Sequence, residues 1–177
     1  MPRSKMPLPR KPGRSLQAGL GKVRMLAMDV DGVLTDAGMY YSESGDELKK
    51  FHTRDGMGIK MLQAAGVITA FVTKEKTAIV ERRGRKLAVP EVHQGIDDKL
   101  TDLTRLARKY GITLTQVAFI GDDVNDLEAL KAVGFSAAPA DAMPVVLDAV
   151  HYVCAKKGGE GAVRELADLI LAARGRS

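Results

Sequence analysis

The chain has 177 residues, of which 45% are hydrophobic and 28% charged, and this balance is typical of a globular protein with an ordinary core. Its single cysteine, Cys154, excludes an internal disulfide framework and is expected to be a small core residue. The sequence has no apolar run long enough for a membrane span or a signal peptide, so no membrane partner is expected and the cytoplasm is the expected compartment.

The net charge of +5 comes from the start of the chain. Residues 1–24 hold seven of the 27 lysines and arginines, none of the 22 acidic residues, and prolines at positions 2, 7, 9 and 12. Because such a stretch has little to bury, residues 1–22 are expected to be a disordered basic leader, followed by a single domain over 23–177. A nucleic-acid-binding arm is the alternative interpretation, but a solvated extension is favoured, and no nucleic acid is expected as a partner.

Beyond the leader, strand-like and helix-like segments alternate. Apolar runs predict strands over 23–30, 67–73, 117–120 and 135–138, with shorter extended segments near residue 92 and over 152–154. Residues 39–41 and 48–51 flank a predicted hairpin tip at 44–46. Helices are predicted over 55–65, where Asp55 is the expected cap, and over 77–87, 98–110, 123–133, 144–150 and 162–173. The alternation predicts an α/β fold with a parallel sheet, whose chemistry lies at the carboxyl ends of the strands.

The first such end carries Asp29-Val30-Asp31-Gly32-Val33-Leu34-Thr35-Asp36. Three acids within eight residues repel one another unless a cation or hydrogen bonds hold them. A solvated Asp-Gly turn would be ordinary, but a turn does not need a carboxylate within an apolar run. This segment is therefore a candidate catalytic site.

The strand over 117–120 ends in Gly121-Asp122-Asp123-Val124-Asn125-Asp126. Asp123 alone would be explained as a helix cap, but capping uses one acid and not three. Together with the first cluster, these carboxylates favour a hard divalent cation that prefers oxygen ligands, and Mg²⁺ is the predicted cofactor.

Two weaker candidates complete the predicted site. Thr73 ends the strand over 67–73, where its hydroxyl could hold a phosphate. Lys99 stands at a helix start, where a lysine opposes the helix dipole and is better placed for binding an anion than for stability. Either residue alone would be an ordinary structural feature.

The order of DVDGVLT, a strand-terminal Thr, an isolated Lys and GDDVND resembles the haloacid dehalogenase superfamily over residues 23–173. The resemblance implies a Rossmann-like sheet with helices on both faces. It further implies that Asp29 is the nucleophile, that Asp31 donates a proton to the leaving oxygen and then activates water, and that Thr73 and Lys99 bind phosphoryl oxygens. Mg²⁺ would be held by Asp29, by Asp31 through its carbonyl, and by Asp122. Asp126 and Asp123 would support these ligands without binding the metal directly.

The stretches between Asp31 and Thr73 and between Thr73 and Lys99 are already filled by the predicted hairpin, helices and strands, so no cap domain is expected. Residues 38–62, 121–130 and 156–166 resemble a capless family, the phosphatases of 3-deoxy-D-manno-octulosonate 8-phosphate and of nonulosonate 9-phosphates. The resemblance implies a homotetramer assembled through the hairpins, in which a glycine-rich tail reaches an active site and each site is completed by a neighbouring subunit. The candidate substrate-binding residues are Thr35, Glu75, Arg83 and Arg164, the last of these because a guanidinium suits a sugar carboxylate.

The segment Thr73-Lys74-Glu75-Lys76 departs from the usual pattern of the octulosonate enzymes, which have Gly and Arg after the Thr or Ser. Glu75 together with Arg83 is more similar to the nonulosonate members. The predicted function is hydrolysis of a small-molecule phosphate ester, with 3-deoxy-D-manno-octulosonate 8-phosphate first and a nonulosonate 9-phosphate as the alternative. Another small phosphorylated metabolite, or a non-catalytic assembly module of a sugar nucleotide pathway, stays open as a further alternative.

Overall fold

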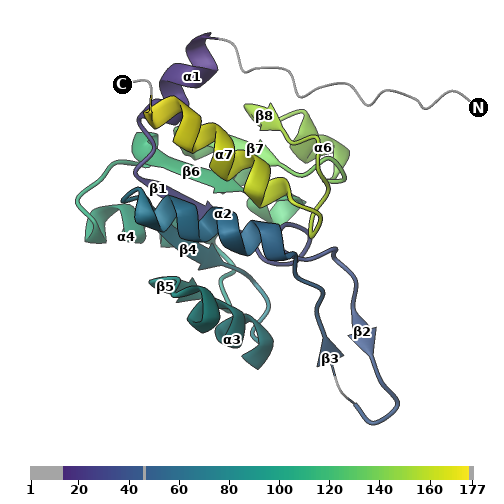
Figure 1. Cartoon of the computed structure of the whole chain (residues 1–177). Helices are drawn as coiled ribbons and strands as arrows, with labels where there is room; N and C mark the ends of the chain where they lie inside the picture. The colour runs from purple at the N-terminus through teal and green to yellow at the C-terminus, as the bar shows by residue number, and fades with distance from the viewer. Residues whose placement is uncertain (1–13, 46, 176–177) are drawn as a thin grey trace, which may run out of the picture.

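The computed structural model describes residues 14–45 and 47–175, and in this part of the chain a parallel sheet lies between two layers of helices (Figure 1). Its strand order is β5-β4-β1-β6-β7-β8, and every neighbouring pair is parallel. The strands are β1 (Met25–Met28), β4 (Ile68–Val72), β5 (Glu91–His93), β6 (Val117–Ile120), β7 (Phe135–Ala138) and β8 (Tyr152–Val153). The predicted α/β fold with a Rossmann-like sheet is confirmed.

The helices follow the predicted alternation closely. They are α1 (Arg14–Gly21), α2 (Thr53–Ala64), α3 (Ala78–Leu87), α4 (Lys99–Lys109), α5 (Leu127–Ala132), α6 (Pro144–Leu147) and α7 (Ala162–Arg174), with short 3₁₀ turns at Leu114–Gln116 (η1) and Val124–Asp126 (η2). Capping explains several starts: the Thr77 hydroxyl accepts from Val80 N at 3.3 Å, and Asp98 accepts from Thr101 N at 2.9 Å.

Both faces of the sheet are buried, and β1 shows how. Its side chains alternate, so that Leu26 and Met28 join the core beneath α1, α2, α3 and α7, while Met25 and Ala27 join the core beneath α4, α5 and α6. In Figure 1, α2 and α7 lie side by side across one face. Cys154 is buried in the first of these cores, as expected.

The start of the chain differs in part from the expectation. Residues 1–13 lie outside the described residues, so the expected disorder of the leader is tested only over its last part. There Arg14–Gly21 form α1, which packs on α7 through a fully buried Leu20, and the disorder prediction is wrong for these residues. Leu20 gives this short helix an apolar contact with the body of the protein, and composition alone did not show that contact.

Two local predictions also change. The residue that caps α2 is His52 and not Asp55, whose buried carboxylate instead accepts a hydrogen bond from Arg164 N at 2.8 Å. The predicted helix over 123–133 begins as the 3₁₀ turn η2, because the Asp123 and Asp126 carboxylates bind nearby backbone N–H groups.

The hairpin predicted between the first strand and α2 is present as β2 (Tyr40–Tyr41) and β3 (Glu47–Leu48), and it projects away from the body (Figure 1). A bridge between Thr35 and Phe51 closes its base. Within the described residues, the segments between β1 and α4 contain this hairpin, two helices and two strands, and no cap domain. None of the helices in the described ranges combines the length and apolar content of a membrane crossing.

Candidate active site

Three neighbouring strands bring the predicted site residues to one edge of the sheet. Asp29 follows β1, Thr73 follows β4, and Asp122 lies just beyond β6. Because β1 lies between β4 and β6, the three strand ends are adjacent. They open into a cavity of about 250 Å³, which is lined by Asp29, Asp31, Ala37, Thr73, Lys74, Glu75, Asp122, Asp123 and Asn125.

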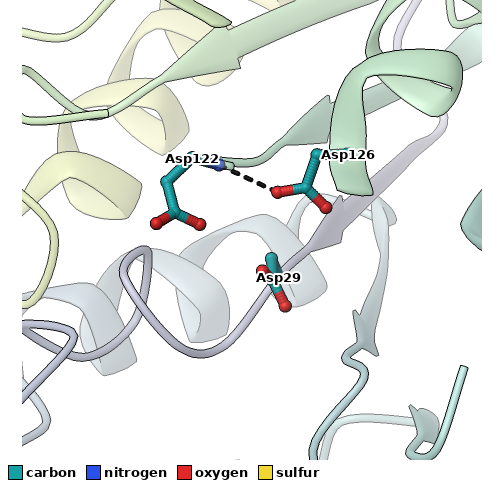
Figure 2. Close-up of side chains that lie close together, drawn as sticks. All are labelled: Asp29, Asp122 and Asp126. Carbon is teal, nitrogen blue, oxygen red and sulfur yellow. Dashed lines mark hydrogen bonds between the residues drawn. The ribbon is translucent and has the colours of Figure 1, made fainter. Parts of the chain in front are cut away.

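Asp29, Asp122 and Asp126 form a compact acid cluster in which one carboxylate oxygen from each residue lies within 4.8 Å of the others. Figure 2 shows Asp29 directly after β1 and near the two acids that follow β6. Asp126 Oδ2 accepts from the backbone N–H of Asp122 at 2.9 Å, so it holds the turn that presents Asp122 (Figure 2).

Lys99 neutralises part of this cluster. Its Nζ lies 3.0 Å from Asp29 Oδ2 and 2.5 Å from Asp126 Oδ1, and the side chain is almost completely buried. A lysine so deep in the protein is stable only when paired. Lys99 does not line the cavity described above, and in this structure it bridges two carboxylates.

Burial and mutual repulsion set the charge state of the cluster. Burial raises the pKa of Asp29 to about 7, against the opposing effect of Lys99. Burial, followed by repulsion from Asp29 and Asp126, raises the pKa of Asp122 to about 8. Burial opposes the charge on Lys99, but attraction to Asp29 and Asp126 outweighs it and raises the pKa of that ammonium group. Three carboxylates therefore share one ammonium group, and two of them ionise less readily than an isolated aspartate.

The residues present fit a magnesium ion. Asp122 Oδ1 is buried without a hydrogen-bond partner, which leaves a carboxylate oxygen available as a ligand. Gly32 permits the approach of Asp122 to the loop after β1, since a Cβ there would lie 1.9 Å from Asp122 Oδ2 and the backbone has a φ of +83°. Asp29 and Asp122 supply the hard oxygen donors that Mg²⁺ prefers.

Asp31 stands apart from the acid cluster, and its partner is a residue that the sequence did not indicate. Lys49 Nζ donates to Asp31 Oδ1 at 2.6 Å, while Asp31 Oδ2 is buried without a partner. Lys49 follows β3, so it comes from the base of the hairpin. The available signal was weak: strand alternation turns one of the two lysines at 49 and 50 inward, but does not say which.

Of the other predicted residues, two line the cavity, and Thr35 makes hydrogen bonds within the loop after β1. Glu75 and Asp123 line the cavity with Thr73, and Asn125 joins them as an unpredicted lining residue. Thr35 lies within the loop after β1, where its hydroxyl accepts from Gly32 N at 3.2 Å and from Ala37 N at 3.3 Å.

Arg83 and Arg164 are not among the residues that line the cavity of their own chain. The Arg83 guanidinium lies over the Phe51 ring and donates to His52 O at 3.2 Å. The side chain of Arg164 pairs with Asp168 on α7 at 2.9 Å.

The glycine-rich segment before α7 packs against the loop after β1 of its own chain. Gly159 N donates to Val33 O at 3.1 Å. A Cβ on Gly158 would lie 1.9 Å from Gly32 O, so only glycine allows this approach. The resemblance implies that this tail reaches an active site, and in the described chain it packs against the loop after β1.

Comparisons with known proteins agree with this geometry. Residues 89–166 match the family model of the haloacid dehalogenase-like hydrolases. The chain is 42% identical over 152 residues to the 3-deoxy-D-manno-octulosonate 8-phosphate phosphatase of Yersinia pestis, covering 86% of this chain and 81% of that protein. The enzyme of the same name from Escherichia coli K12 is 40% identical over 154 residues, covering 87% and 82%.

A solved structure provides a third comparison. The 3-deoxy-D-manno-octulosonate 8-phosphate phosphatase of Moraxella catarrhalis, in complex with magnesium ion, phosphate ion and KDO, superposes with a TM-score of 0.89 at 38% identity. The match covers 92% of this chain and 93% of the other.

Proposed function

The chain belongs to the 3-deoxy-D-manno-octulosonate 8-phosphate phosphatases among the haloacid dehalogenase-like hydrolases, and from this premise we propose that it hydrolyses 3-deoxy-D-manno-octulosonate 8-phosphate. As a member it is a phosphoric monoester hydrolase with Mg²⁺ as cofactor. The choice of sugar and the roles of individual residues are the proposed part.

The proposed reaction proceeds in two steps. An Asp29 carboxylate oxygen attacks phosphorus, the bond between phosphorus and the sugar oxygen breaks, and Asp31 gives its proton to that oxygen. Asp31 then takes a proton from the water that attacks phosphorus, which releases phosphate and restores Asp29. A covalent nucleophile divides a difficult hydrolysis into two easier steps. When bound, Mg²⁺ supplies positive charge that offsets the repulsion between carboxylate and phosphate.

The observation that carries this proposal is the separation of the two aspartates that follow β1. Asp29 belongs to the acid cluster and to Lys99, whereas Asp31 is held by Lys49 with one oxygen unpartnered. One residue is thereby equipped for attack on phosphorus and the other for proton transfer. The same residues weigh against a non-catalytic module, which would have no use for four carboxylates and a buried lysine at one sheet edge.

The sugar acid is chosen from the relatives, and Glu75 supports the alternative. Relatives at 40–42% identity are named for the octulosonate ester. Glu75 lines the cavity, where its carboxylate can accept hydrogen bonds from sugar hydroxyls, and an acid at this position together with Arg83 is more similar to the nonulosonate members than to the octulosonate enzymes. This feature favours a nonulosonate 9-phosphate as the second candidate.

A phosphate-release screen tests the proposal. The two sugar acid phosphates are compared with sugar phosphates of similar size that lack a carboxylate, in excess Mg²⁺. The octulosonate ester is expected to give the highest kcat/KM, and Glu75→Gly is expected to shift the preference away from any nonulosonate ester. Equal kcat/KM for esters with and without a carboxylate would overturn the proposed substrate class and leave the phosphatase activity standing.

We further propose a homotetramer in which a neighbouring hairpin covers each cavity, and a cytoplasmic location. Arg83 and Arg164 are then candidates for contacting substrate in a neighbouring subunit, because neither lines the cavity of its own chain. Cell fractionation tests the location.

A further inference from the structure

At the end of β3 and in the two residues after it, an apolar side chain is exposed and a charged side chain is buried. Leu48 is 63% exposed and the Lys50 side chain is 53% exposed, while the Lys49 side chain between them is only 1% exposed. Burying a lysine side chain costs stability unless its ammonium group is paired. A stabilising role does not explain this arrangement, so the direction of Lys49 calls for a functional reason.

Lys49 points toward Asp31, and the contact leaves half of that carboxylate available. The 2.6 Å hydrogen bond uses Asp31 Oδ1 alone, and Oδ2 has no partner although it is buried. The nearest other carboxylate oxygen paired with Lys49 is Glu47 Oε1 at 3.6 Å, beyond hydrogen-bond reach. Lys49 is therefore a one-point anchor for Asp31.

The carboxylates of Asp29 and Asp31 differ in how many of their oxygens have a partner. Asp29 is held on both oxygens, by Val30 N at 2.7 Å and by Lys99 at 3.0 Å, which fixes the whole carboxylate. Asp31 has no Lys99 contact and does not belong to the acid cluster. Its orientation toward the cavity depends on the single cation that the hairpin supplies.

We propose that Lys49 is a positioning residue that orients Asp31 so that Oδ2 transfers the proton to and from the reacting oxygens. This inference rests on the proposed proton-transfer role of Asp31. In the first step the Oδ2 proton goes to the leaving oxygen as that oxygen takes the electron pair of the broken P–O bond. In the second step Oδ2 receives a proton from the attacking water.

The test uses a series of substituted phenyl phosphates whose leaving phenols differ in acidity but hardly in size. An acidic phenol leaves without a proton, whereas a weakly acidic phenol needs one. Because kcat/KM reports steps up to the breaking of the P–O bond, its dependence on phenol acidity measures proton donation. The variants are Lys49→Met, Lys49→Gln, Asp31→Asn and the matched control Lys50→Met.

Lys49→Met is expected to lose roughly tenfold or more in kcat/KM on phenyl phosphate beyond its loss on 4-nitrophenyl phosphate, which is part of the contribution that general acid catalysis makes. Lys49→Gln keeps a polar side chain in the buried space, so it serves if the methionine variant does not fold, and it is expected to show the same selective loss. Lys50→Met removes an equal charge one residue away, at a side chain that pairs with Asp36, and should behave as wild type.

The outcomes separate the inference from its premise. Selective loss in Asp31→Asn and in the Lys49 variants supports both. Selective loss in Asp31→Asn, with equal losses on all esters or none in the Lys49 variants, overturns the positioning role alone. No selective loss in Asp31→Asn overturns the proton-transfer role of Asp31, and the inference with it.

Discussion

At the scale of single residues, the site works because sequence-distant acids are forced together against their mutual repulsion. Asp29, Asp122 and Asp126 approach within 4.8 Å, and Lys99 contacts only two of them. Such an arrangement stores an unfavourable interaction that a divalent cation relieves.

This excess charge predicts how stability depends on pH when magnesium is removed. The pKa values of Asp29 and Asp122 rise from an ordinary 3.8 to about 7 and about 8 on folding. Between 3.8 and those values the folded state binds more protons than the unfolded state, so the free energy of unfolding falls as pH rises through that window. Thermal unfolding in excess chelator at pH 5 and pH 8 measures the fall, and Mg²⁺ should raise Tm more at pH 8 than at pH 5.

The matched control for this prediction is Asp122→Asn, which keeps the shape of the side chain and removes its ionisation. It should lose less stability than wild type between the two pH values. An identical pH dependence in the two proteins would show that Asp122 is not ionised against its surroundings in the folded state.

At the scale of elements, the strand ends that carry the site residues were predictable, and the contacts that hold the loops after them were not. Short apolar runs followed by Asp29, Thr73 and Asp122 identify parallel strands and their functional edge, because periodicity and polarity are local properties of the chain. The contact between Lys49 and Asp31, and the packing of Gly158 on Gly32, join segments far apart in sequence. Only the tertiary fold decides which of many lysines and glycines makes such contacts.

The α1 helix is a second case in which a long-range contact could not be predicted from the local sequence. Its basic, proline-rich surroundings favoured disorder, yet Leu20 is buried and the helix packs on α7. Tertiary packing overrides a weak local preference when a partner surface is available. The partner, α7, lies at the opposite end of the sequence.

The glycine-rich segment before α7 yields a prediction about the loop after β1. In Gly158→Ala the added Cβ would meet Gly32 O at 1.9 Å, so the loop that carries Asp31 has to move. We expect kcat to fall by about tenfold or more, since a misplacement of about 1 Å can cost 10²-fold. Steady-state kinetics with 4-nitrophenyl phosphate measures the loss, and circular dichroism checks that the fold persists.

Gly175→Ala is the control for this variant. Its Cβ would lie 3.6 Å from Leu171 O, an ordinary contact, so activity should be unchanged. Full activity in Gly158→Ala would mean that the loop does not need the support of the glycine segment.

At the scale of the whole molecule, the hairpin is the part of the described chain least explained by a monomer. Met39, Tyr40, Tyr41 and Leu48 are 47%, 44%, 67% and 63% exposed on a two-stranded projection. An isolated hairpin is marginally stable in water, and exposed apolar strand edges favour pairing. Assembly through the hairpins would cover these side chains and would fix the arm that carries Lys49.

We therefore predict four chains in solution by light scattering, and smaller species for Tyr41→Glu. Placing a charge in a buried interface is strongly unfavourable, whereas Val153→Glu, at an apolar residue 43% exposed on β8, should leave the assembly intact. A monomeric wild-type protein would contradict the proposed tetramer, without bearing on the acid cluster.

The central claim is that Asp29 is the nucleophile of a magnesium-dependent phosphatase, and Asp29→Asn tests it most directly. Asparagine keeps the size of the side chain but cannot form the acyl phosphate. Phosphate release from 3-deoxy-D-manno-octulosonate 8-phosphate in excess Mg²⁺ is measured for wild type, Asp29→Asn and the exposed control Asp148→Asn. Asp148→Asn should match wild type, and Asp29→Asn should fall below about one hundredth of it, because losing a covalent nucleophile costs several orders of magnitude. Residual activity of a folded Asp29→Asn protein above that level would contradict the account.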